Sequence, residues 1–223
     1  MARRTGEIAK SIELVLLRPR ATPADCRDLC ELALVHHVAA VCVPPTHVAA
    51  AAGVLGGTDV KLVALISHPF GGDRPEIKAR ACVQAIREGA QEVEVAADLA
   101  QFAGGDPTYV RDELRRCVQA AREADTEALV RGVIDTGVFD DRTLRLLARA
   151  VVAAGVDMLV TSSGLSPEPN DVLDVELMRE EVGAEIGVKA VRGVRGLDEV
   201  SALLVAGASR VGATSADVLL ADA

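Results

Sequence analysis

The sequence predicts a single (β/α)8 barrel, in which eight parallel strands alternate with helices and close into a ring. Apolar runs typical of buried strands alternate with helical segments along the whole chain. Half of the residues are hydrophobic but only 2% are aromatic, so Val, Leu, Ile and Ala must form the core. That composition suits parallel strands covered by Ala-rich helices. The 223 residues suit one domain, which we expect to span 1–223.

Eight strands are expected where short runs are rich in Val, Leu, Ile and Ala. Their ranges are 12–17, 38–43, 60–66, 92–96, 128–134, 157–161, 186–191 and 209–212. Helices are expected between and after them, near 23–36, 46–54, 75–89, 108–124, 140–154, 171–182, 196–206 and 214–221.

Several helix ends carry local signals. Thr22-Pro23 and Asp106-Pro107 each place a capping residue before a proline, which is favoured at the first helical position. Glycines are expected just after three of the helices, where a left-handed conformation is common: Gly89, Gly155 and Gly207.

A doubly wound open sheet is the alternative arrangement of so many strand–helix units. That fold requires a glycine-rich phosphate turn after the first strand, and LRPRATP contains no glycine. The glycines that follow strands instead come late, at Gly164, Gly193 and Gly212. Since barrels commonly bind phosphate at their late strand-to-helix loops, this placement favours the closed barrel.

Charge and composition limit the classes of partner. The formal net charge of −9 disfavours a general nucleic-acid or anionic-membrane surface. No apolar run is long enough to span a bilayer, and the start MARRTGEIAK lacks an apolar signal region, so we expect a cytoplasmic protein. A small molecule is the expected partner, and a homodimer stays open. We expect no metal or cofactor, and we interpret the cysteines as buried, reduced thiols: Cys26, Cys30, Cys42, Cys82 and Cys117.

Lys189 is the leading catalytic candidate. It is the one lysine of four that lies in the middle of an apolar strand, IGVKAV. A buried ammonium is costly unless it is paired. One interpretation is an amine of depressed pKa that forms a Schiff base or transfers protons, and nearby cations such as Arg131 would depress that pKa further. The other, equally weighted, is an ion pair with Glu94 or Glu13 that stabilises the barrel interior.

Glu94 is the expected proton-transfer partner of Lys189, and Glu13 is a further catalytic candidate. We expect Glu94 to line the barrel and its neighbour Glu92 to face the other way. His47 and His68 are further acid–base candidates, but a loop histidine is more often structural or exposed.

An anion site is expected at the late loops. The phrases VTSSGLSP, VRGVRG and VGATSAD place small hydroxyl residues, glycines and arginines after strands six to eight. Ordinary helix capping by Ser and Thr is the alternative. The candidates are Gly164, Arg192, Gly193, Arg195, Gly212, Thr214 and Ser215, together with Arg131 on strand five. Arg192 has a second interpretation, in which its side chain fills the anion pocket.

These segments together resemble the deoxyribose-phosphate aldolase family from about residue 12 to the C-terminus. The phrases that carry the resemblance, in the family's order and spacing, are IELVLLRPRATPADCRDLCELA, VAAVCVPPTHVAAA, GAQEVEVAADLA, GVIDTGVFDD, GVDMLVTSSGLSP, GVKAVRGVRGLDEV and GASRVGATS. The resemblance implies a (β/α)8 barrel whose late glycines meet as a phosphate site.

The resemblance is weakest at the residues that carry the family's chemistry. The family's Schiff-base lysine on strand six is replaced by Val160, which cannot form an imine. The family's second lysine, which tunes the first by like-charge proximity, is retained as Lys189, and its strand-four aspartate corresponds to Glu94. Arg131 stands for a family lysine, and Arg192 replaces the first of two glycines in the phosphate turn.

These replacements concentrate at the site while turns and caps survive, which indicates a repurposed site. The resemblance implies an aldolase-like lyase that acts on a small carbonyl compound, phosphorylated or otherwise anionic. The reaction would be C–C bond cleavage or formation, or a related enolisation or cyclisation. The alternative is an inactive aldolase-like barrel that binds a metabolite or a protein partner.

Overall fold

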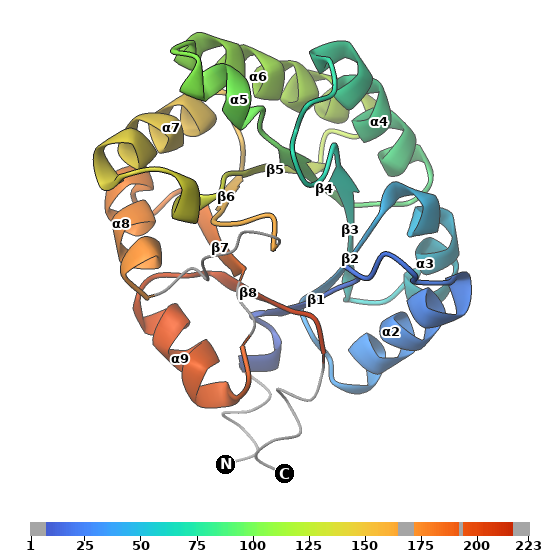
Figure 1. The fold of residues 1–223 in the computed structure, drawn as a ribbon. Helices are drawn as coiled ribbons and strands as arrows, with labels where there is room; N and C mark the ends of the chain where they lie inside the picture. The colour runs from blue at the N-terminus through green and yellow to red at the C-terminus, as the bar shows by residue number, and fades with distance from the viewer. Residues whose placement is uncertain (1–7, 165–171, 192–193, 216–223) are drawn as a thin grey trace.

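The computed structural model describes residues 8–164, 172–191 and 194–215. Eight parallel strands follow one another around a closed barrel, and β8 pairs with β1 (Figure 1). The strands are β1 (Ile12–Val15), β2 (Ala40–Val43), β3 (Lys61–Ile66), β4 (Glu92–Ala96), β5 (Leu129–Val133), β6 (Met158–Val160), β7 (Gly187–Val191) and β8 (Arg210–Ala213). The predicted (β/α)8 fold is confirmed.

Helices surround the barrel on its outside (Figure 1). They are α2 (Pro23–Val35), η1 (Pro45–His47), α3 (Val48–Leu55), α4 (Pro75–Arg87), α5 (Leu99–Ala103), α6 (Pro107–Ala124), η2 (Thr136–Val138), α7 (Asp141–Ala153), α8 (Val172–Val182) and α9 (Leu197–Val205). The short helix α5, which we did not predict, is capped at its start by Asp98, whose carboxylate accepts from two backbone amides. Residues 216–221 of the last predicted helix lie outside the described residues.

The predicted helix ends have the expected local contacts. Thr22 and Asp25 form a reciprocal capping box at the start of α2, and Asp106 caps α6. The three glycines after helices have positive φ, at Gly89, Gly155 and Gly207. The caps fix where α2 and α6 begin, and the glycines allow the chain to turn where three other helices end.

The largest apolar cluster fills the space between the barrel and the helices, and two smaller clusters lie apart from it. All five cysteines are buried and free, as predicted. Within the described part of the chain, no helix combines the length and apolar character needed to cross a membrane.

Candidate functional site

Lys189 lies inside the barrel between two carboxylates. Its Nζ donates to Glu94 Oε2 at 2.6 Å and also to Glu13 Oε1. Lys189 and Glu13 are 0% exposed and Glu94 is 3% exposed. The three residues predicted as catalytic therefore meet, and their contacts are those of the ion pair that the sequence offered as one of two interpretations.

Arg131 completes this network instead of lying with the anion-binding candidates, which corrects our assignment of it. Its Nη1 contacts Glu13 Oε2 at 2.6 Å and Glu94 Oε2 at 3.2 Å, and its Nη2 contacts Glu92. Arg131 is 1% exposed, so its guanidinium faces carboxylates and not the solvent. Arg210 adds a third cation 3.3 Å from Glu13 and from Glu92. We call these six residues the interior network: Glu13, Glu92, Glu94, Arg131, Lys189 and Arg210.

The expectation that Glu92 and Glu94 face opposite sides of β4 was wrong. Both carboxylates contact Arg131 inside the barrel. Residues two apart on a strand share a face, so the alternation itself should have placed both inside. Arg210 was missed for a related reason. It lies two residues before Gly212 on β8, so the same alternation places both residues on the inner face of the barrel.

The network makes Lys189 an ammonium. Burial alone would lower the pKa of Lys189, but the carboxylates of Glu13 and Glu94 outweigh it and raise that pKa above its ordinary value. The pKa of Glu13 is lowered because its three cationic neighbours outweigh burial, whereas burial raises the pKa of Glu94 despite Lys189. The structure therefore contradicts the interpretation of Lys189 as an amine with a depressed pKa.

An apolar cluster lies on the C-terminal side of the network. Ala96, Val133 and Val160 are buried together, with Val191 packed against them. Ala96, Val133 and Val191 each follow a network residue by two positions, so they face the same interior one step nearer the strands' carboxyl ends. Val160 pairs in register with Val133 and Lys189. Val160, the position at which the resemblance implies the family's lysine, therefore belongs to an apolar layer.

Among the residues that the structure describes, Glu13, Cys42 and Glu94 form a set that could hold a metal ion, because their ligand atoms lie within 4.8 Å of one another. The ammonium of Lys189 already bonds to both carboxylates. Burial first, and then Glu94, raise the pKa of the Cys42 thiol well above its usual value. A metal would have to displace Lys189 and bind a thiol that resists ionisation, so this set is better explained as the ammonium's own site.

The anion-binding candidates are only partly brought together. The described ones follow or end β6, β7 and β8: Gly164, Arg195, Thr214 and Ser215 are exposed, and Gly212 is buried. The Gly164 N–H donates to Ser162 Oγ, and the Ser163 N–H donates to Asp135. These two amides of the β6 turn are thus already engaged within the protein. Arg192 and Gly193 lie outside the described residues, so the turn after β7 stays a prediction.

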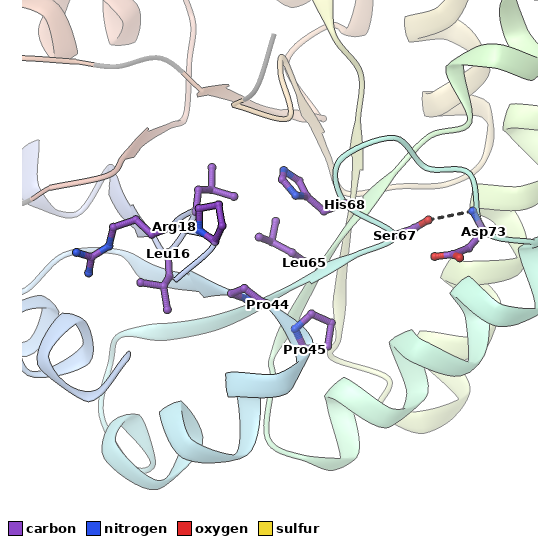
Figure 2. A pocket seen from close by; sticks show the side chains of 10 residues that line it. Leu16, Arg18, Pro44, Pro45, Leu65, Ser67, His68 and Asp73 are labelled. Carbon is purple, nitrogen blue, oxygen red and sulfur yellow. Dashed lines mark hydrogen bonds between the residues drawn. The ribbon is translucent and has the colours of Figure 1, made fainter. Parts of the chain in front are cut away.

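A hollow of about 480 Å³ lies at the carboxyl ends of β1, β2 and β3 (Figure 2). We call it the lateral pocket. It is lined mainly by leucines and prolines, with polar side chains at Arg18, Ser67, His68 and Asp73. His68 Nε2 lies 2.7 Å from the carbonyl oxygen of Ser163 in the β6 turn. Since a carbonyl can only accept, Nε2 carries the proton.

Gly71 fixes the loop that carries His68. A Cβ there would lie 2.2 Å from the carbonyl oxygen of Ala97, and its φ is +65°. We expect Gly71→Ala to lower the free energy of unfolding by at least about 2 kcal/mol, because it combines overlap with a left-handed backbone. The adjacent Gly72 has nothing within 4 Å, so Gly72→Ala is the matched control and should change little. Urea denaturation of both variants measures this, and equal stabilities would contradict it.

A second buried ion pair was not anticipated from the sequence. Lys78 Nζ donates to Glu113 Oε2 at 2.6 Å and to the Ala96 carbonyl at 2.8 Å, and Glu113 Oε1 accepts from the Asp98 amide at 2.7 Å. Both side chains are 0% exposed. This pair holds the end of the strand that carries Glu94. A lysine on an amphipathic helix looks like a surface residue in the sequence, which is why we missed it.

Comparisons with known proteins agree with this fold. No family model matches the chain. A deoxyribose-phosphate aldolase of Clostridium perfringens is 35% identical over 94% of this chain and 92% of its own length. The enzyme of the same name from a Geobacillus strain is 39% identical over 94% and 93%.

A solved structure gives the same result. The deoxyribose phosphate aldolase of Aeropyrum pernix, described as a tetramer, superposes with a TM-score of 0.90 at 28% identity and covers 98% of this chain and 92% of its own. With relatives at 35% and 39% identity over nearly its whole length, the chain belongs to the deoxyribose-phosphate aldolase family, a family of lyases.

Proposed function

We propose that the chain is a divergent aldolase that acts on a small anionic carbonyl compound without forming an imine. The reaction is C–C bond cleavage or formation, or a related enolisation or cyclisation. The observation that carries the proposal is the pairing of Lys189 with Glu13 and Glu94, in register with Val160, where the resemblance implies the family's imine lysine. A phosphorylated substrate would suit the exposed Thr214 and Ser215 after β8.

In this proposal Lys189 acts as a charged proton donor. An ammonium in a water-poor site stabilises an oxygen on which negative charge develops, and it can donate a proton to that oxygen. Glu94 receives or returns protons, because burial raises its pKa toward the range useful for acid–base work. Glu13 stays ionised and holds the ammonium in place. The substrate must displace part of the apolar layer to reach Lys189.

The test combines turnover with chemical trapping. Purified protein is assayed for aldehyde release from deoxyribose phosphate and from other phosphorylated hydroxy carbonyl compounds, and each reaction is repeated with borohydride and analysed by mass spectrometry. We expect turnover without a covalent adduct, and little turnover of deoxyribose phosphate itself. Lys189→Met and Glu94→Gln should each lower kcat by at least about 100-fold, whereas Lys10→Met, in an exposed pair with Asp59, should not.

Two results would contradict the proposal. A borohydride adduct on Lys189 would mean that the imine mechanism has moved to that residue. Unchanged turnover in both Lys189→Met and Glu94→Gln would mean that the interior network is not the catalytic site.

The second candidate is a barrel that binds a metabolite or protein without catalysis. The complete burial of Lys189, behind the apolar layer that contains Val160, favours it. It predicts that no carbonyl compound in the panel is turned over, while ligand binding still raises the thermal midpoint.

A further inference from the structure

We propose that the lateral pocket binds the alkyl end of a β-hydroxy carbonyl compound, and that His68 accepts a hydrogen bond from its hydroxyl group. The carbonyl part of this ligand class rests on the proposed function. The apolar substituent and the role of His68 rest on the pocket itself.

The volume and position of the pocket suit a small ligand. Its volume of about 480 Å³ is within the range of small-molecule sites, roughly 300–1,000 Å³. It opens at the carboxyl ends of β1, β2 and β3, the end at which barrels of this type place their ligands. His68 also contacts the turn after β6, so the pocket adjoins the loop that follows Val160.

The lining selects an apolar group. Six of the lining side chains have no hydrogen-bonding atom: Leu16, Leu17, Pro19, Pro44, Pro45 and Leu65. A sugar chain placed against them would leave its hydroxyls without partners, which costs binding free energy for each group. An unbranched alkyl chain has no such cost and gains from leaving water.

His68 is the polar group best placed to recognise the ligand. The Ser163 carbonyl accepts a hydrogen bond from Nε2–H, so Nδ1 is the acceptor in this tautomer. Among the described residues, Nδ1 makes no hydrogen bond. Two hydrogen bonds hold the loop that carries His68. The Ser67 carbonyl accepts from the Gly71 amide. Ser67 Oγ accepts from the Asp73 amide, as Figure 2 shows. A ring fixed in one orientation with one free acceptor suits a hydroxyl donor.

The experiment is calorimetric titration of the full chain with β-hydroxy ketones that carry a methyl, a propyl or a pentyl substituent. We expect affinity to rise with chain length, by up to about fourfold for each added methylene. The measurement on the unmodified protein needs no variant, so it does not depend on whether a variant folds.

Three variants separate the two parts of the proposal. His68→Phe keeps an aromatic ring but loses the hydrogen-bond acceptor. It should therefore weaken the binding of all three ketones by a similar factor of about 3 to 10. Leu17→Asn, at a half-buried wall position, should reduce the gain from methyl to pentyl. Phe70→Ala is the matched control, because Phe70 is 85% exposed on the same loop and does not line the pocket.

Equal affinities for the three ketones, no binding of any of them, or unchanged affinity in His68→Phe would overturn this inference. Binding that follows chain length without turnover would instead contradict the proposed catalysis and leave the pocket assignment intact. The two proposals therefore fail by different measurements.

Discussion

Lys189→Met is expected to lower the free energy of unfolding by about 3–5 kcal/mol, the usual cost of removing one partner from a buried ion pair. Methionine has nearly the length of lysine and leaves little empty space, so the loss reports the missing charge. Without the ammonium, Glu13 and Glu94 remain buried, and less positive charge is left to offset the burial and mutual repulsion of their carboxylates. Urea denaturation at neutral pH measures the difference.

Lys10→Met is the control for the Lys189→Met measurement. Lys10 also pairs with a carboxylate, Asp59, but both side chains are largely exposed. Such surface pairs contribute about 0–1 kcal/mol. If Lys10→Met and Lys189→Met have the same small effect, Lys189 is not the central cation of the network.

The decrease in the free energy of unfolding that Lys189→Met causes should become smaller as the pH falls. The pKa of Glu13 is lowered by folding, so its favourable contribution is present above its unfolded pKa and is lost as the pH falls through the folded pKa. The pKa of Glu94 is raised by burial, so folding favours its protonated form and its contribution has the opposite sign. Without the ammonium, both carboxylates bind protons at a higher pH than they do in the unmodified protein, and a protonated carboxyl group no longer needs the cation. A loss that is the same at pH 4 and pH 7 would contradict this account.

The scaffold was predictable because its signals are local. Each predicted strand lies within two residues of the observed one, since apolar runs and the glycines and caps between them act over a few residues. The ion pair between Lys189 and Glu13 was only one of two interpretations of the sequence, because 176 positions separate these residues in the chain. The sequence suggests such a contact but does not decide between an ion pair and a free amine.

The errors at the site have identifiable physical causes. Arg131 was grouped with the anion-binding residues because arginine commonly binds phosphate, yet its place on β5 points it at three carboxylates. The lateral pocket was missed because it arises from three strand ends that are distant in the sequence. His68 was identified, but its hydrogen bond to Ser163, 95 positions away, could not be read from the chain.

Val160→Lys is expected to give the chain an amine that forms an imine, which we propose the unmodified protein does not form. Val160 is 0% exposed and pairs in register with Lys189, so a lysine there would lie beside an ammonium and among Ala96, Val133 and Val191. The like charge and the apolar surroundings both lower the pKa of the new amine, so a useful fraction is neutral and nucleophilic near pH 7. Incubation with acetaldehyde and borohydride, followed by peptide mapping, should place an adduct at position 160.

Val160→Met is the matched control, since methionine is of similar length and carries no amine. It should give no adduct, as should the unmodified protein. The lysine variant should also be less stable than Val160→Met, and this difference should shrink as the pH rises, because a lysine whose pKa is lowered by folding makes folding more favourable at higher pH. An adduct on Lys189 in the unmodified protein would show that the loss at position 160 did not remove imine chemistry. An adduct that appears only in Val160→Lys would mean that the interior network lowers the pKa of a neighbouring amine far enough for that amine to form an imine.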